Sequence, residues 1–135
     1  MDRIEVYFDG SSQPAREGRV ARYGFVIYRD GRPMIREGGV VRKGGDATNN
    51  VAEYTALIKA LERLKKEGLV GEITVYGDSE LVIRHLKGVY AVRSERLRSL
   101  YEKALGLIHE LGARVEWVPR EKNTEADALS KGSRT

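Results

Sequence analysis

Apolar and polar residues alternate over several short segments of the chain, which is the pattern of a strand with one buried face. Residues 2–9 show it first, because Ile4, Val6 and Phe8 fall on one face while polar residues and a tyrosine fall on the other. The segment RDGRP separates two further alternating segments and predicts a tight hairpin between them. The pattern predicts strands at residues 2–9, 22–30, 33–41, 72–77 and 113–118.

Other segments repeat apolar residues every three or four positions, which is typical of a helix with one buried stripe. Tyr54, Leu57, Ile58 and Leu61 follow this spacing, and Gly68 ends the segment. The pattern predicts helices at residues 50–67, 79–86, 94–111 and 124–131, the last of them capped by Thr124.

The predicted order is β-β-β-α-β-α-α-β-α. Hairpins make the first three strands antiparallel, and right-handed crossovers set the fourth strand parallel to the first and the fifth parallel to the fourth. We therefore expect an α/β protein with a mixed five-stranded sheet and helices on both faces. A length of 135 residues suits a single domain.

This topology carries four acidic residues to one edge of the sheet. Asp9 ends the first predicted strand, and Asp78 directly follows the fourth. These two strands would be neighbours in the sheet, and adjacent strands lie ~4.8 Å apart. Glu53 and Asp127 fall in the first turns of helices that begin at the same edge. The ordinary structural interpretations stay open. Asp9 would then belong to a turn and Asp78 would cap a helix. Glu53 would form a capping box with Asn50, and Asp127 would support a helix N-terminus.

Four carboxylates in one small patch would repel one another and raise each other's pKa. Oxygen-ligated Mg²⁺ or Mn²⁺ would relieve that repulsion. Zinc is disfavoured, because cysteine is absent and both histidines, His85 and His109, lie far along the chain from the acidic segments. Carboxylate sites with two such ions suit phosphoryl transfer. No phosphate-binding loop of the Gly-x-x-x-x-Gly-Lys-Ser/Thr type is present, so hydrolysis of a phosphodiester is the leading hypothesis.

The net charge of +4 and the pI of about 9.4 are compatible with a polyanionic partner. No apolar run approaches the ~20 residues of a membrane span. The N-terminus lacks the pattern of a signal peptide, so we expect a cytoplasmic protein without a membrane partner. Trp117 is expected in the core.

The segments YFDGSS, TNNVAEYTALIKAL, VYGDSELVI and WVPREKNTEADALS resemble the four acidic motifs of type 1 ribonuclease H, in order and spacing, over essentially the whole chain. The resemblance implies one catalytic domain over residues 1–135 with the ribonuclease H-like fold. It implies endonucleolytic, Mg²⁺-dependent cleavage of the RNA strand of RNA–DNA hybrids, with Mn²⁺ as a possible substitute and with 5′-phosphate and 3′-hydroxyl products. By this likeness Asp9 would bridge two ions and Asp127 would hold the ion that activates water. Glu53 and Asp78 would hold the ion at the leaving oxygen.

The resemblance also implies contacts to the nucleic acid. Asn49 and Asn50 match residues that face the minor groove, and Thr48 matches one that holds a phosphate of the DNA strand. Ser11 and Ser12 could add hydrogen bonds from the first loop. Asn49 or Asn50 could instead be only a helix cap, and the serines could be solvated turn residues.

Three features depart from the common pattern of the family. The segment PREKNT lacks the histidine that many members have at this place, and in this respect the sequence resembles the archaeal-type branch. Arg120 of this segment could act electrostatically, or it could be a surface arginine. Glu80 stands where members often have a glutamine, and an ionised carboxylate cannot donate to a base edge. The segment LKGVYAVRSERLR replaces a basic protrusion.

These departures leave alternatives open. One is a nuclease of the same fold that also cuts double-stranded RNA. Another is a catalytically weak module that binds nucleic acid. A monomer is expected in each case.

Overall fold

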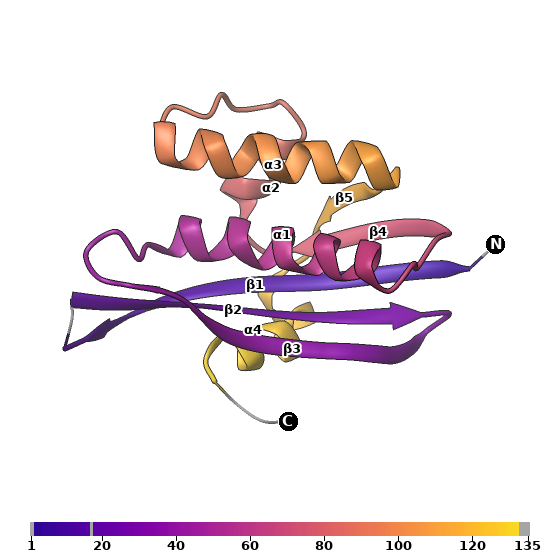
Figure 1. Cartoon of the computed structure of the whole chain (residues 1–135), viewed down its shortest axis with the longest axis horizontal. Coiled ribbons are helices and arrows are strands. Elements are labelled where there is room, and N and C mark those ends of the chain that lie inside the picture. The colour runs from indigo at the N-terminus through magenta and orange to yellow at the C-terminus, as the bar shows by residue number, and fades with distance from the viewer. Residues whose placement is uncertain (1, 17, 133–135) are drawn as a thin grey trace.

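A computed structural model describes residues 2–16 and 18–132, and one five-stranded sheet runs through it (Figure 1). β1, β2 and β3 are antiparallel neighbours, whereas β4 is parallel to β1 and β5 is parallel to β4. The order across the sheet is β3-β2-β1-β4-β5, which confirms the predicted mixed sheet. The strands are β1 (Arg3–Ala15), β2 (Gly18–Arg29), β3 (Arg32–Lys43), β4 (Glu72–Gly77) and β5 (Arg114–Trp117).

Helices cover both faces of this sheet. In Figure 1, α1 lies against one face and α3 packs beside α1, whereas α4 lies on the other face. No helix within the described part of the chain has the length and apolar character that crossing a membrane requires. The helices are α1 (Asn49–Lys66), α2 (Glu80–Leu86), α3 (Glu95–Leu111) and α4 (Thr124–Ser130), with a short 3-10 turn η1 (Arg120–Lys122) before α4.

The main core lies between the sheet and α1. Ile4, Val6 and Phe8 are fully buried on the β1 face that the alternation predicts, and Leu57 and Leu61 of α1 pack into the same cluster. Removing apolar side chains of this size from water contributes about 1.5–3 kcal/mol each. The opposite face of β1 is thereby left to carry polar and aromatic side chains.

The first strand is longer than predicted, because β1 continues past Asp9 to Ala15. Asp9 pairs with Gly24 and Gly10 with Tyr23 of β2, so the predicted turn at Asp9-Gly10 is wrong. Gly10 instead allows the start of α1 to pack closely against β1. A Cβ there would lie 2.3 Å from backbone atoms of Ala52 and Glu53, so the start of α1 lies directly on the strand.

The helix caps also differ from the predictions. Thr48, rather than Asn50, caps α1 by accepting a hydrogen bond from the Val51 amide at 3.2 Å. Ser79 caps α2, which leaves the carboxylate of Asp78 free of capping. Thr124 is the first residue of α4 and does not cap it. Together with the turn at Asp9, three of the ordinary interpretations of the acids therefore do not hold.

Candidate metal centre

Three of the four predicted acids meet at one point. Each of Asp9, Glu53 and Asp78 offers a carboxylate oxygen, and these oxygens lie within 4.8 Å of one another. Asp9 comes from the middle of β1, Glu53 from the second turn of α1 and Asp78 from the residue after β4. The parallel pairing of β1 with β4 and the contact of α1 with Gly10 bring them together.

Asp127 lines the same cleft of about 340 Å³ from α4, but it is not within that group of three. The ammonium of Lys131 lies 3.2 Å from Asp127 Oδ2, one helical turn away. Lys131 itself also lines the cleft. The structure puts its charge beside the cleft.

Burial dominates the electrostatics of the site. It raises the pKa of Asp9 to about 7; a hydrogen bond with Glu53 lowers that pKa in part, and the charge of Asp78 raises it. Burial likewise raises the pKa of Glu53 well above its ordinary value, and the neighbouring charge of Asp9 adds to the effect. Both side chains are nearly inaccessible, at 5% and 6% exposure.

The donor set fits a hard divalent cation. Glu53 Oε2 is buried and has no hydrogen-bond partner among the described residues. Buried polar atoms are normally paired, so an unpaired carboxylate oxygen beside two more carboxylates calls for a positive ligand. Oxygen-only sites of this kind are those that Mg²⁺ and Mn²⁺ prefer.

Two residues that the sequence analysis missed hold the acids in place. The Asn123 amide donates to the Phe8 carbonyl at 2.9 Å and to Asp78 Oδ2 at 3.0 Å. The Ser130 hydroxyl donates to the Asp127 carbonyl at 2.7 Å and lies 3.3 Å from Asp9 Oδ2. The only available signal was their presence beside Asp127 in the motif.

Trp117 also contributes outside the core. Its ring nitrogen donates to the Asp78 carbonyl at 3.1 Å, and 45% of the residue is exposed. The expectation of a core tryptophan is therefore wrong. Trp117 is the last residue of β5, an edge strand, where one side of the ring stays open to solvent.

Most of the predicted nucleic-acid contacts lie around the cleft. Asn49, Asn50, Arg120, Ser11 and Ser12 line it together with the acids. Thr48, although it caps α1, lies directly before this group. Glu80 does not line the cleft and forms an ion pair with Arg84 at 3.4 Å.

The two serines are engaged with protein groups. Ser11 is buried, and its hydroxyl donates to the Ser130 carbonyl at 2.7 Å, which links β1 to the end of α4. The Ser12 hydroxyl donates to the Ala47 carbonyl and accepts from Arg19 Nε at 2.6 Å. Ser12 therefore joins β1 to the loop before α1, and it places the Arg19 guanidinium at that side of the cleft.

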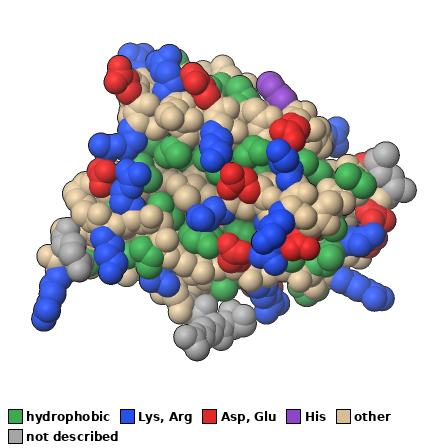
Figure 2. Space-filling model, in the orientation of Figure 1, with side chains coloured by type: hydrophobic (Ala, Val, Ile, Leu, Met, Phe, Trp, Pro, Cys, Tyr) green, Lys and Arg blue, Asp and Glu red, His purple; other side chains and the backbone are tan. Residues whose placement is uncertain are grey.

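The segment between α2 and α3 carries positive charge that is partly neutralised. Lys87 pairs with Glu116 at 3.0 Å, and the Arg98 guanidinium donates to the Val92 carbonyl at 2.8 Å. Figure 2 shows basic and acidic side chains mixed over the visible face, without a continuous field of one sign. Of the Lys87 and Arg98 charges, only that of Lys87 is paired with a carboxylate among the described residues, because the hydrogen bond from Arg98 to a carbonyl leaves its charge in place.

Comparison with known proteins places this arrangement in a family. A family model described as reverse transcriptase-like matches residues 8–133. Over 136 residues the chain is 38% identical to ribonuclease HI of Halobacterium salinarum, covering 95% of this chain and 62% of that protein. The chain thus spans less than two thirds of that relative's length.

Two solved structures share the fold closely. The crystal structure of RNase H1 from the same halophilic archaeon has a TM-score of 0.86 and 35% identity, covering 97% of this chain and 96% of that one. LC11-RNase H1, solved in complex with an RNA/DNA hybrid, has a TM-score of 0.84 and 34% identity, covering 96% and 95%. The fold is therefore the ribonuclease H-like fold. The chain belongs to the type 1 ribonuclease H family.

Proposed function

We propose that this chain hydrolyses the RNA strand of RNA–DNA hybrids and leaves 5′-phosphate and 3′-hydroxyl ends. The main support for this proposal is that carboxylate oxygens of Asp9, Glu53 and Asp78 lie within 4.8 Å of one another. Among the described residues, one buried oxygen of Glu53 has no hydrogen-bond partner. The hybrid bound to the similar LC11-RNase H1 supports the choice of substrate.

Divalent ions belong to this proposal, since the family uses them. Asp9, Glu53 and Asp78 would hold two Mg²⁺ ions together with Asp127, and Mn²⁺ would be a substitute. Bound there, the ions would supply an activated water and neutralise charge on the phosphate. Ionisation of the acids is a condition for this, because a protonated carboxyl binds a cation poorly.

The remaining residues position the acids and the substrate. Asn123 and Ser130 would keep the carboxylates of Asp78 and Asp9 at a fixed place through their hydrogen bonds. Asn49 and Asn50, at the rim, would reach 2′-hydroxyls and base edges in the wide minor groove of the hybrid.

The positive charges around the cleft would bind the backbone. Arg120 would attract a phosphate near the acids, and it stays protonated, so it would not act as a base. Thr48, directly before α1, and Arg19, which donates to the cleft residue Ser12, would hold phosphates of the nucleic acid. We further propose a monomer with residues 1–135 as one catalytic domain, because one chain supplies all four acids.

The test is a cleavage assay on an end-labelled hybrid, with Mg²⁺, Mn²⁺ or EDTA, for the native chain and for Asp9→Asn. Cleavage of the RNA strand by the native chain only, and only with a metal ion, supports the proposal. Equal cleavage by Asp9→Asn, or none by the native chain, contradicts it. Duplex RNA and duplex DNA in parallel reactions decide whether the chain also cuts double-stranded RNA.

A further inference from the structure

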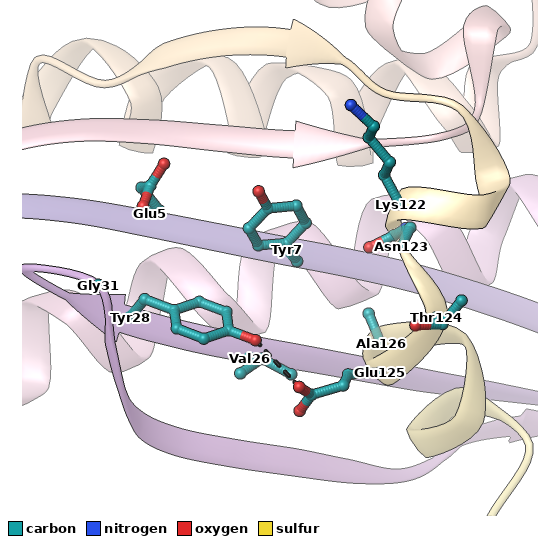
Figure 3. A pocket seen from close by; sticks show the side chains of 10 residues that line it. All are labelled: Glu5, Tyr7, Val26, Tyr28, Gly31, Lys122, Asn123, Thr124, Glu125 and Ala126. Carbon is teal, nitrogen blue, oxygen red and sulfur yellow. Dashed lines mark hydrogen bonds between the residues drawn. The ribbon is translucent and has the colours of Figure 1, made fainter.

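A second pocket lies on the sheet face that carries α4, and the metal-centre acids do not line it. Its volume is about 300 Å³, and side chains from β1, β2 and the segment from η1 to α4 surround it (Figure 3). Its lining comprises Glu5, Tyr7, Val26, Tyr28, Gly31, Lys122, Asn123, Thr124, Glu125 and Ala126.

The walls of this pocket are aromatic. The rings of Tyr7 and Tyr28 lie 5.8 Å apart with planes at 82°, so they form a corner. Behind them Tyr76 of β4 stacks on Tyr7 at 4.9 Å and 20°. The faces of tyrosine rings are negative and attract cations that come within about 6 Å.

Two carboxylates stand beside the aromatic corner. Glu125 accepts a hydrogen bond from the Tyr28 hydroxyl at 3.1 Å. It also forms an ion pair with Arg36 at 3.0 Å, and the side chains of Glu125 and Arg36 are each about two-fifths exposed. Among the described residues the Glu5 carboxylate makes long contacts, 3.4 Å to the Tyr76 hydroxyl and 3.8 Å to Arg3. Exposed ion pairs of this kind are weak, so both carboxylates keep capacity for another donor.

An unpaired acceptor is the independent sign of a ligand. Asn123 is 1% exposed, and its Oδ1 has no hydrogen-bond partner among the described residues. Its Nδ2 donates to two acceptors, Phe8 O and Asp78 Oδ2, which fixes the orientation of the amide. Figure 3 shows the Asn123 oxygen on the side of Tyr7. A buried acceptor on a pocket wall calls for a donor inside the pocket.

We propose that this pocket binds the guanidinium group of an arginine side chain that a partner protein presents. The polar side chains that line the space are chiefly acceptors and tyrosine rings, and the Thr124 hydroxyl lies among them. Lys122 directs its ammonium away from Tyr28 and Glu125 (Figure 3). A guanidinium is planar, stacks on tyrosine and carries five donors, so it can bond to more than one of the acceptors Glu5, Glu125 and Asn123.

Other ligands fit the pocket less well. An ammonium has no plane to stack and is held more strongly by water. A nucleotide would bring its phosphate towards Glu5 and Glu125, which repel it. None of the metal-centre acids lines the pocket, and Asn123 is the residue that the two sites share.

The test uses the ¹⁵N-labelled chain of residues 1–135 in EDTA and the peptide acetyl-Gly-Arg-Gly-amide, observed by NMR. A peptide with citrulline, the neutral isostere of arginine, a peptide with lysine, and GMP are titrated in parallel. We expect the arginine peptide to shift the Asn123 side-chain amide and the neighbouring backbone amides, with affinity on the order of millimolar for one side chain. The citrulline peptide should cause no shift, and the lysine peptide should bind several-fold more weakly.

Substitutions then locate the binding. Glu125→Gln and Glu5→Gln should each weaken the arginine peptide about tenfold, the effect of one lost charge-assisted hydrogen bond. Glu121→Gln, a charge-matched change on η1 outside the pocket, should leave it unchanged. Two pocket variants are used so that the test remains possible if one of them does not fold. The amide spectrum of each variant shows directly whether it is folded. Absence of arginine binding, equal binding of citrulline, binding of GMP instead, or unchanged affinity in both pocket variants would each overturn the proposal.

Discussion

The Asn123 amide donates to Asp78 Oδ2 at 3.0 Å, although 45 residues separate the two along the chain. The same nitrogen donates to the Phe8 carbonyl, one residue before Asp9. A single side chain thus ties the start of α4 to both central strands of the sheet at the point where their acids meet.

Asn123→Ala should therefore impair the metal centre without removing any proposed ligand. Loss of such supporting hydrogen bonds typically costs about 10–100-fold in metal affinity or activity. The measurement is the hybrid cleavage rate as a function of Mg²⁺ concentration, where the concentration for half-maximal rate should rise. A folded variant with unchanged metal dependence would show that Asn123 is only structural.

Asp9→Asn should change how stability depends on pH in metal-free protein. The pKa of Asp9 is about 7 in the fold and 3.8 as its ordinary value, so the folded state binds more protons than the unfolded state between these values. Asp9 therefore lowers the free energy of unfolding as pH rises from about 4 to 7, and the full loss remains above 7.

Asparagine does not titrate, so the variant should lose less stability over that range and should equal or exceed the native chain at pH 8. Urea unfolding in EDTA at pH 5 and pH 8 measures both. Glu121→Gln, an exposed change elsewhere, is the control and should follow the native profile. Parallel profiles for the native chain and Asp9→Asn would contradict the raised pKa.

Gly10→Ala should destabilise the fold by more than an ordinary surface change. The new Cβ would lie 2.3 Å from backbone atoms of Ala52 and Glu53, and overpacking typically costs about 1–3 kcal/mol or more. The proposed ligand Glu53 would move with α1, so cleavage should fall as well.

Gly106→Ala is the matched control for this change. Gly106 lies inside α3, and a Cβ added there would meet no atom of another element within 4 Å, so alanine should stabilise the helix by about 0.5–1 kcal/mol. Thermal unfolding of both variants compares them directly. Equal effects of the two substitutions would mean that α1 does not approach β1 as closely as described.

Tyr54→Phe should destabilise the protein by about 1–3 kcal/mol, because it leaves a buried histidine nitrogen without its partner. The Tyr54 hydroxyl and His85 Nδ1 lie 2.7 Å apart in the core. Burial lowers the pKa of His85, so the native chain should lose stability as pH falls below about 6.5, the unfolded value. Urea unfolding of native and variant chains at pH 7.5 measures the cost. Equal free energies of unfolding for the native chain and Tyr54→Phe, within experimental error, would show that the Tyr54–His85 hydrogen bond does not stabilise the fold.

Local patterns determined most of the fold. The alternation in residues 2–9, the helical spacing around Leu57 and the right-handed crossovers predicted the elements, their order and the sheet topology, because these depend on short-range periodicity and chain chirality. The acids Asp9, Glu53 and Asp78 followed from the same topology, since parallel strands end at a common edge.

Only the tertiary structure decided what depends on distant partners. β1 runs through Asp9-Gly10 because β2 pairs with it there, which overrides a local turn signal. Asn123 and Ser130 reach residues 115 and 121 positions away, so no local pattern could reveal them. The pocket beside Tyr7 arises because three strands and the start of α4 bring rings and carboxylates together, and such placement exists only once the chain has folded.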